Sequence, residues 1–193
     1  PFVSKATGIP IARVAARVLL ARLLIDSENY AEAEQQVRDA LAVNPRSPDA
    51  LTVLAAIHYL RDQNQAFDEL VNEIQQIAPG YARLFQTLAE VAGQNRRYRN
   101  AAQFAVVAIN LDPTAWNGHV LLGQNRLRLG EMERGRRSLE TAFRGDPYEV
   151  RSKNTLDLLD RLDRFEIMRS ERFVLVAEPG EGLKSVSSNN KNP

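Results

Sequence analysis

Helix-like stretches of mixed apolar and polar residues fill most of the chain, and prolines interrupt them at regular intervals. Pro45, Pro79, Pro113 and Pro147 are 34 residues apart, and each follows a stretch that ends in a short polar turn. Because proline cannot continue a helix interior and is common just past a helix end, these positions predict helix ends at a constant spacing. A period of 34 residues is long enough for two helices joined by a turn.

Small residues recur in fixed columns when each of these prolines is taken as position 32 of a unit. They are Ala21, Ala55, Ala89 and Gly123 at position 8, Ala33, Ala101 and Gly135 at position 20, and Ala40, Ala108 and Ala142 at position 27. Small side chains are needed where two antiparallel helices approach closely. Position 7 is always leucine, and we expect it to fill the space between helices. These residues are Leu20, Leu54, Leu88 and Leu122.

This pattern resembles the tetratricopeptide repeat, whose 34-residue helix-turn-helix units carry small residues at positions 8, 20 and 27 and proline at position 32. The resemblance covers four units, at residues 14–47, 48–81, 82–115 and 116–149. It implies an all-α fold, a right-handed solenoid of four helix pairs. In this family the first helix of each unit lines a concave groove, so the resemblance also implies a surface for binding proteins or peptides.

Two units depart from the family pattern. Phe67 and Ile74 are bulky where the family is small, which predicts a splayed second unit. Gly118, Gly123 and Gly135 lower the helix propensity of the fourth unit. We therefore expect the fourth unit to be the least rigid, unless a close approach of its two backbones explains the glycines.

The ends of the chain follow different patterns. Residues 1–13 are interpreted as a lead-in, with a helix beginning near Pro10. Residues 150–164 carry leucines on one stripe, which predicts a helix that covers the last repeat. Residues 165–193 contain two short β-branched or alternating runs and a polar tail, which predict a short β-hairpin. An isolated hairpin is marginal in water, so we interpret this segment as the start of a truncated following domain.

A second resemblance concerns the same segment. The run NTLDLLDRLDRFEIMRSERFVLVAEPGEG at residues 154–182 looks like the junction in bacterial proteins where tetratricopeptide repeats precede a gluzincin-like metallopeptidase domain of the peptidase MA type. The match contains no catalytic residue, so it implies a neighbouring domain rather than an activity. The alternative function is therefore the regulatory or substrate-presenting arm of a larger zinc metallopeptidase.

The composition and the absence of known motifs mainly exclude kinds of catalysis and of metal binding. The 193 residues include no cysteine and two histidines, His58 and His119, which excludes thiol chemistry and leaves a poor set of metal ligands. Zinc-peptidase, serine-hydrolase and phosphate-loop motifs are absent from the sequence. We therefore predict a non-catalytic protein without metal or cofactor.

Net charge and hydropathy limit the classes of binding partner that we expect. A net charge of +1 does not favour nucleic acid, and no apolar run reaches the length of a membrane span. The chain begins at Pro1 rather than methionine, so we expect the native N-terminus to be missing, and the localisation stays undetermined. Association of the chain with itself through the ends of the array is a further alternative.

The leading functional prediction is a protein-interaction scaffold that holds a peptide or protein in its groove. The family's groove positions assign Arg22, Tyr59, Arg83, Gln86, Glu90, Gln94, Asn117, Gln124 and Arg128 to the partner-binding surface. Residues 82–153 also carry 12 basic and 7 acidic side chains, which suggests a basic ridge at neighbouring inter-helix turns. Its candidates are Arg96, Arg97, Arg99, Arg134, Arg136 and Arg137. They are interpreted as a solvated face first and as a docking site for an acidic segment second.

Overall fold

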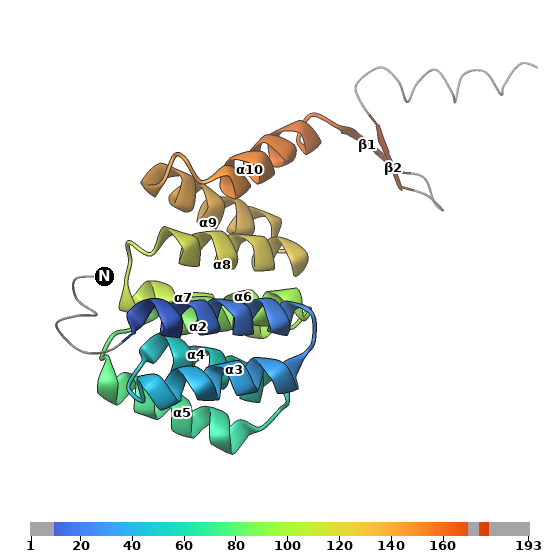
Figure 1. Ribbon diagram of the computed structural model, residues 1–193. Helices are drawn as coiled ribbons and strands as arrows, with labels where there is room; N and C mark the ends of the chain where they lie inside the picture. Colours follow the sequence, from blue (N-terminus) through green and yellow to red (C-terminus); the bar gives the residue numbers. More distant parts are fainter. Residues whose placement is uncertain (1–9, 170–173, 178–193) are drawn as a thin grey trace, which may run out of the picture.

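A computed structural model describes residues 10–169 and 174–177, and over these residues the chain is an array of helices followed by two short strands (Figure 1). The helices are α2 (Ile11–Asp26), α3 (Tyr30–Val43), α4 (Pro48–Leu60), α5 (Asn64–Ile77), α6 (Ala82–Gln94), α7 (Tyr98–Leu111), α8 (Trp116–Arg128), α9 (Met132–Gly145) and α10 (Val150–Leu162). The strands are β1 (Glu166–Arg169) and β2 (Val174–Ala177). The predicted helical array is thus confirmed.

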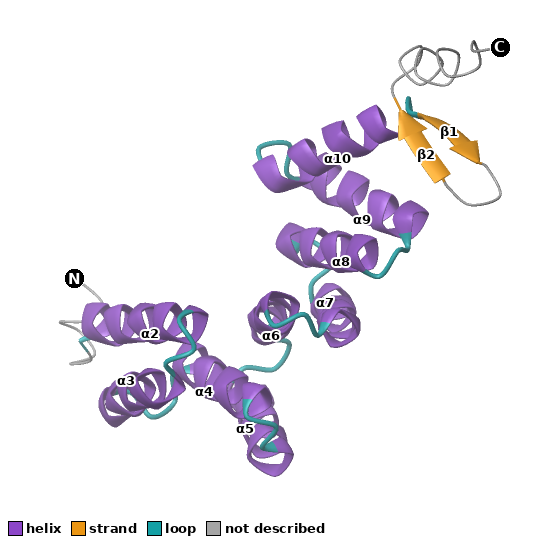
Figure 2. Ribbon diagram, turned by 90° about the vertical axis from the view of Figure 1, so that its right-hand side faces the viewer, coloured by secondary structure: helices purple, strands orange, loops and turns teal. Residues whose placement is uncertain are grey.

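The helices form four consecutive hairpins, α2–α3, α4–α5, α6–α7 and α8–α9, and α10 packs on α9. The first helices of successive hairpins also contact one another, so α2, α4, α6 and α8 form one side of the array. Figure 2 shows α2 and α6 on either side of α4, so these three helices do not lie in one plane. This is the side on which the candidate groove lies.

The small residues of the repeat are buried where the helices meet. Ala21, Ala89, Ala101 and Ala108 have no exposed surface, as predicted. Their burial lets neighbouring backbones approach closely and places larger side chains around them. Apolar clusters therefore run through the array, three of them joining one hairpin to the next and one joining the fourth hairpin to α10.

Position 15 of every unit is the residue at which the chain turns between its two helices. Glu28, Asp62, Arg96 and Gly130 all have a positive φ, between 56° and 81°. Only glycine adopts this left-handed conformation without a steric cost. The turn is thus a repeated backbone feature that three different side chains tolerate, and the residue columns alone did not reveal it.

The glycines of the fourth unit are explained by close packing. A Cβ on Gly123 would lie 2.6 Å from Leu139 Cγ, and one on Gly135 would lie 2.6 Å from Leu127 Cδ2. Backbone contacts between α8 and α9 are also the most extensive in the array. The expectation of a loose fourth unit is therefore wrong, and the alternative of a close approach is correct.

The bulky residues of the second unit hold α5 away from α4. Ile74 is fully buried, and the Phe67 ring lies 5.7 Å from that of Tyr59 and 6.4 Å from that of Phe104. Backbone contacts between α4 and α5 are sparser than in the other three hairpins. This wider spacing agrees with a splayed second unit.

One leucine of position 7 is not where the repeat pattern placed it. Leu54, Leu88 and Leu122 are buried, whereas Leu20 is 42% exposed. Each of the other three is covered by the hairpin that precedes it, and among the described residues α2 is the first helix. The prediction that Leu20 fills a space between helices is therefore wrong.

The two strands follow directly on α10. They pair antiparallel, with Glu166 opposite Ala177 and Arg169 opposite Val174. Residues 170–173, which join them, and the predicted tail at residues 178–193 lie outside the described residues, as do residues 1–9 of the lead-in. The hairpin as a unit, and the domain it would begin, remain predictions.

Glu149 caps α10, and its lowered pKa makes the stability of the fold depend on pH. Burial opposes the charge of Glu149, but hydrogen bonds from Arg151 Nε (2.7 Å) and from the Ser152 amide (2.6 Å) outweigh it, so its pKa lies below the ordinary 4.5. A lowered pKa stabilises the fold fully above the unfolded-state pKa, and this stabilisation is lost as the pH falls through the folded-state value.

We expect Glu149→Gln to destabilise the protein by about 1 kcal/mol at pH 7 and to have less effect at pH 3. Urea melts at both pH values, followed by circular dichroism, measure the difference. Asp157→Asn, on the exposed side of the same helix, is the control for loss of a charge. An equal effect of Glu149→Gln at both pH values would contradict the capping role.

Candidate functional site

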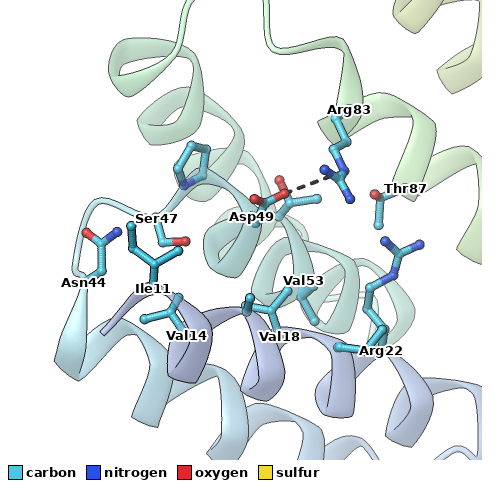
Figure 3. A pocket seen from close by; sticks show the side chains of 14 residues that line it. Ile11, Val14, Val18, Arg22, Asn44, Ser47, Asp49, Val53, Arg83 and Thr87 are labelled. Atoms are coloured by element: carbon cyan, nitrogen blue, oxygen red, sulfur yellow. Dashed lines mark ion pairs between the residues drawn. The ribbon is translucent and has the colours of Figure 1, made fainter. Parts of the chain in front are cut away.

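A hollow of about 500 Å³ opens between α2, α4 and α6 on the concave side (Figure 3). Ile11, Val14 and Val18 form an apolar wall on α2, and Asn44 and Ser47 close one end. Arg22, Asp49, Arg83 and Thr87 lie at the opposite end. The hollow therefore combines a surface for an apolar side chain with polar groups that can orient a ligand.

The polar end is arranged around Asp49. Its carboxylate accepts a hydrogen bond from the Tyr81 hydroxyl at 2.6 Å and lies 3.6 Å from Arg83 Nε. Burial raises the pKa of Tyr81, and the hydrogen bond to Asp49 raises it further. Tyr81 thus stays a neutral donor, and the Arg83 side chain, which is 62% exposed, keeps donors for a ligand.

Thr52 contributes an unpartnered hydroxyl to the same hollow. The residue is 3% exposed, and its Oγ1 has no hydrogen-bond partner among the described residues. Leaving a buried hydroxyl without a partner costs free energy, so such groups are usually satisfied in the functional state. A ligand seated in the hollow could supply the missing partner.

An ion pair crosses the groove next to this hollow. Arg22 Nη2 on α2 lies 2.7 Å from Glu90 Oε2 on α6, and the two residues are two repeats apart. The pair lines a smaller hollow of about 120 Å³ together with Gln94. The sequence placed all three residues in the groove, but gave no indication that two of them bind each other.

A wider and more polar depression continues the groove toward α8 and α10. It has a volume of about 700 Å³ and is lined by Gln86, Arg83, Asn117 and Arg151 among others. Arg151 Nη2 donates to Asn117 Oδ1 at 2.7 Å, which fixes both side chains. Of the predicted groove residues, Arg22, Arg83, Gln86, Glu90 and Asn117 therefore line one continuous surface.

Three predicted groove residues lie elsewhere. Tyr59 is 8% exposed, and its ring packs 5.3 Å from that of Phe104, so its assignment to the groove is wrong. Arg128 is held to the Gly93 carbonyl at 3.4 Å and stacks over the Tyr98 ring at 5.3 Å. Gln124 is half-buried on α8 and lines none of the described hollows. The wider spacing of α5 explains why Tyr59 is buried, because aromatic rings fill the space between α5 and α4.

The predicted basic ridge is divided by internal ion pairs. Arg97 donates to both carboxylate oxygens of Asp62 and to the Tyr59 and Leu60 carbonyls at the end of α4. Arg136 lies 2.5 Å from both Asp160 and Asp163. These two arginines are therefore structural, and a continuous basic ridge is not formed.

The remaining members of that set are exposed. Arg96, Arg99 and Arg137 lie at the surface, and Arg134 lies 3.5 Å from Glu131. Arg99 and Arg134 flank a shallow, partly apolar hollow between α7 and α9. These four fit the interpretation as solvated surface.

Sequence reasoning missed the apolar wall of the hollow. Ala15 and Val18 occupy the groove positions 2 and 5 of the first unit, where the second and third units carry polar residues such as Arg83 and Gln86. Two apolar residues at groove positions were the available signal. Thr52 at position 5 of the second unit is the polar counterpart on the opposite wall.

Within the described part of the chain, no three His, Asp or Glu residues are grouped in a way that could hold a metal ion. Among the helices that the structure describes, none combines the length and apolar character of a membrane span.

Comparison with known protein families agrees with the helix pairs. A model described as "Tetratricopeptide repeat" matches residues 14–57, which contain α3, α2 from Val14 onward and most of α4. Residues 14–57 are therefore similar to a tetratricopeptide repeat. The match begins at the first residue of the first predicted unit. A comparison with curated proteins finds none that matches the chain.

Solved structures with a similar fold cover most of the array. A thermophilic tetratricopeptide repeat protein of Thermus thermophilus has a TM-score of 0.54 and 21% identity, covering 78% of this chain and 84% of that chain. PilF of Pseudomonas aeruginosa has a TM-score of 0.53 and 21% identity, covering 77% and 68%. MamA of Desulfovibrio magneticus RS-1 has a TM-score of 0.50 and 14% identity, covering 77% and 84%. At these identities the likeness shows the fold alone, a tetratricopeptide repeat solenoid.

Proposed function

We propose that this chain is a non-catalytic scaffold that binds a peptide or protein segment in the concave groove formed by α2, α4 and α6. The hollow at the beginning of this groove is the observation that carries the proposal. It offers an apolar wall, an exposed arginine and a buried hydroxyl without a partner within one site. A segment with a bulky apolar side chain next to hydrogen-bond acceptors would match all three features.

The groove carries charges of both signs, which favours a mixed ligand over a purely acidic one. Arg22 is already paired with Glu90, and Arg83 faces Asp49 at a distance longer than a hydrogen bond. Arg83 is therefore the cation with the most unused donors at this site. It is expected to contact an acceptor on the ligand and to contribute to its orientation.

A displayed library of random linear peptides tests the proposal without a known partner. Peptides enriched on the wild-type protein are expected to share a bulky apolar residue and to bind Arg83→Glu at least about tenfold more weakly. The substitution removes a charge-assisted donor at a site that is mostly exposed, so the melting temperature should hardly change. Thr52→Val, which keeps the shape and removes the hydroxyl, should weaken the same peptides by a smaller factor.

Arg99→Glu is the matched control because it reverses the same charge on an exposed part of α7. It should leave peptide affinity unchanged. Peptides that bind Arg83→Glu as tightly as the wild-type protein would show that they use another surface. Failure to enrich any peptide over the empty support would contradict the proposal itself.

A role as the regulatory or substrate-presenting arm of a zinc metallopeptidase is the second candidate. The observation in its favour is the antiparallel pairing of β1 and β2 immediately after α10. Reading the coding sequence past residue 193 tests it. A downstream helix with a zinc-binding HExxH motif would support this role, and a continuation without one would contradict it.

A further inference from the structure

The first helix of the array exposes side chains that the later units bury. In the second unit, positions 6, 7 and 10 are Val53, Leu54 and Ile57, and in the fourth they are Leu121, Leu122 and Asn125; each is 9% exposed or less. The corresponding residues on α2 are Leu19, Leu20 and Leu23, which are 62%, 42% and 57% exposed. The repeat itself thus shows that this face is built to be covered by another helix.

The connection that precedes the later units is not formed before α2. Helices α4, α6 and α8 begin at position 1 of their units, at Pro48, Ala82 and Trp116. In the same register α2 begins three residues earlier, at Ile11, so helix occupies the place of the usual loop. The entry to α2 thus differs from the entry to each later first helix, which favours a partner helix that is not joined to α2 by the usual loop.

The exposed face of α2 has the spacing of a helix-pairing seam. Ala12, Ala16, Leu19 and Leu23 follow one another at intervals of four, three and four residues, and all four are exposed. This is the spacing of the core positions of a coiled coil. The side chains of this seam are small at the N-terminal end of α2 and large toward its C-terminal end.

We propose that this face of α2 binds a second copy of the chain, with the two α2 helices antiparallel across a two-fold axis. In this arrangement Leu23 of each copy faces Ala12 of the other, and Leu19 faces Ala16. Large side chains then meet small ones along the whole seam, so the surface complements itself, as a two-fold interface requires. A parallel pair would place leucine against leucine and leave a gap between the alanines.

Arg17 lies near the proposed axis, and its charge is already compensated within each copy. Its guanidinium contacts Asp39 at 2.5 Å and Gln36 at 3.0 Å on α3. The two copies can therefore approach there without two uncompensated charges meeting. One helix face is smaller than the roughly 800 Å² that each partner of a standard interface buries, so we expect dissociation constants of about 10–100 µM.

Sedimentation equilibrium over a range of concentrations measures the association. The weight-average mass should rise from 21.6 kDa toward twice that value as the concentration passes the dissociation constant. Leu20→Glu with Leu23→Glu should keep the mass at the monomer value at every concentration. Neither residue lines the groove, so peptide binding should be retained.

The matched control is at the other end of the array. Leu158→Glu with Leu162→Glu replaces two leucines on α10 that are 54% and 44% exposed, and it should leave the association unchanged. Loss of association in this variant, with retention in the α2 variant, would overturn the proposal. So would a wild-type protein that stays monomeric at all concentrations.

Cysteine pairs test the antiparallel order, because the chain has no cysteine of its own. Mixing Ala12→Cys with Leu23→Cys should give disulfide-linked heterodimers under mild oxidation. Two copies of Ala12→Cys should not link to each other, since their Cα atoms would be about 16 Å apart. Preferential linking of like variants would overturn the antiparallel order.

The melting temperature of the α2 variant distinguishes this proposal from the alternative that residues of the same molecule cover the exposed face of α2. If residues of the same molecule cover this face, the protein should be monomeric at every concentration and the double substitution should lower its melting temperature. That result would show that the proposal is wrong. If a second copy covers it, the melting temperature at concentrations far below the dissociation constant should equal that of the wild-type protein.

Discussion

Replacing Ile74 with alanine is expected to lower the free energy of unfolding by about 3 kcal/mol. Ile74 stands at position 27, where the other units carry alanine, so the repeat pattern alone would predict that alanine is tolerated. In the structure the side chain is fully buried in the cluster that joins α5 to α4 and α6. Alanine would leave a cavity there, because α5 is already held at a wider spacing.

Urea denaturation followed by circular dichroism measures this loss. Ile74→Val is the graded control and should cost about 1 kcal/mol, since it removes one methylene group from the same space. A change below about 1 kcal/mol for Ile74→Ala would mean that α5 closes onto α4 and fills the cavity. That outcome would contradict the view that the bulky residues set the spacing of the second unit.

Gly123→Ala is expected to destabilise the protein by about 2 kcal/mol, although alanine favours helix. The added Cβ would lie 2.6 Å from Leu139 Cγ and 3.0 Å from the backbone oxygen of Gly135. The leucine side chain can move, but the backbone of α9 cannot move without separating the hairpin. The cost of overpacking therefore exceeds the gain in helix propensity.

Gly118→Ala is the matched control on the same helix. Its nearest neighbour would be Ile109 Cγ1 at 3.2 Å, on a side chain that can yield by a small rotation. Thermal melts of the two variants should therefore differ, with Gly118→Ala close to the wild-type protein. Equal melting temperatures for both variants would show that α8 and α9 pack less tightly than described.

The repeat period and the core columns could be predicted because they depend on local constraints. Proline ends a helix wherever it occurs, and an alanine in a fixed column is needed wherever two helices cross. Pro79 and Ala89 could thus be placed from sequence alone, and the structure has α6 begin between them and bury Ala89 completely. Whether Leu20 is buried or exposed could not be predicted in this way, because its exposure depends on a neighbouring hairpin and not on the unit itself.

The candidate site was harder to predict because its contacts join different units. A column states which face of a helix a residue occupies, but not which residue of another unit it will meet. Arg97 is typical: its position at a turn indicated exposure, whereas its partner Asp62 and the carbonyls at the end of α4 come from the unit before. Tyr59 shows the same limit, since only the spacing of α5 decides that its ring turns inward.

The ion pair between Arg22 and Glu90 joins two hairpins that are not consecutive in the chain. It links the first hairpin to the third on the hollow side, so separating these two hairpins would break it. Both side chains are about one-third exposed, so dissolved salt screens the tie, as it does other surface ion pairs. The contribution of this ion pair to holding the two hairpins together therefore decreases as ionic strength rises.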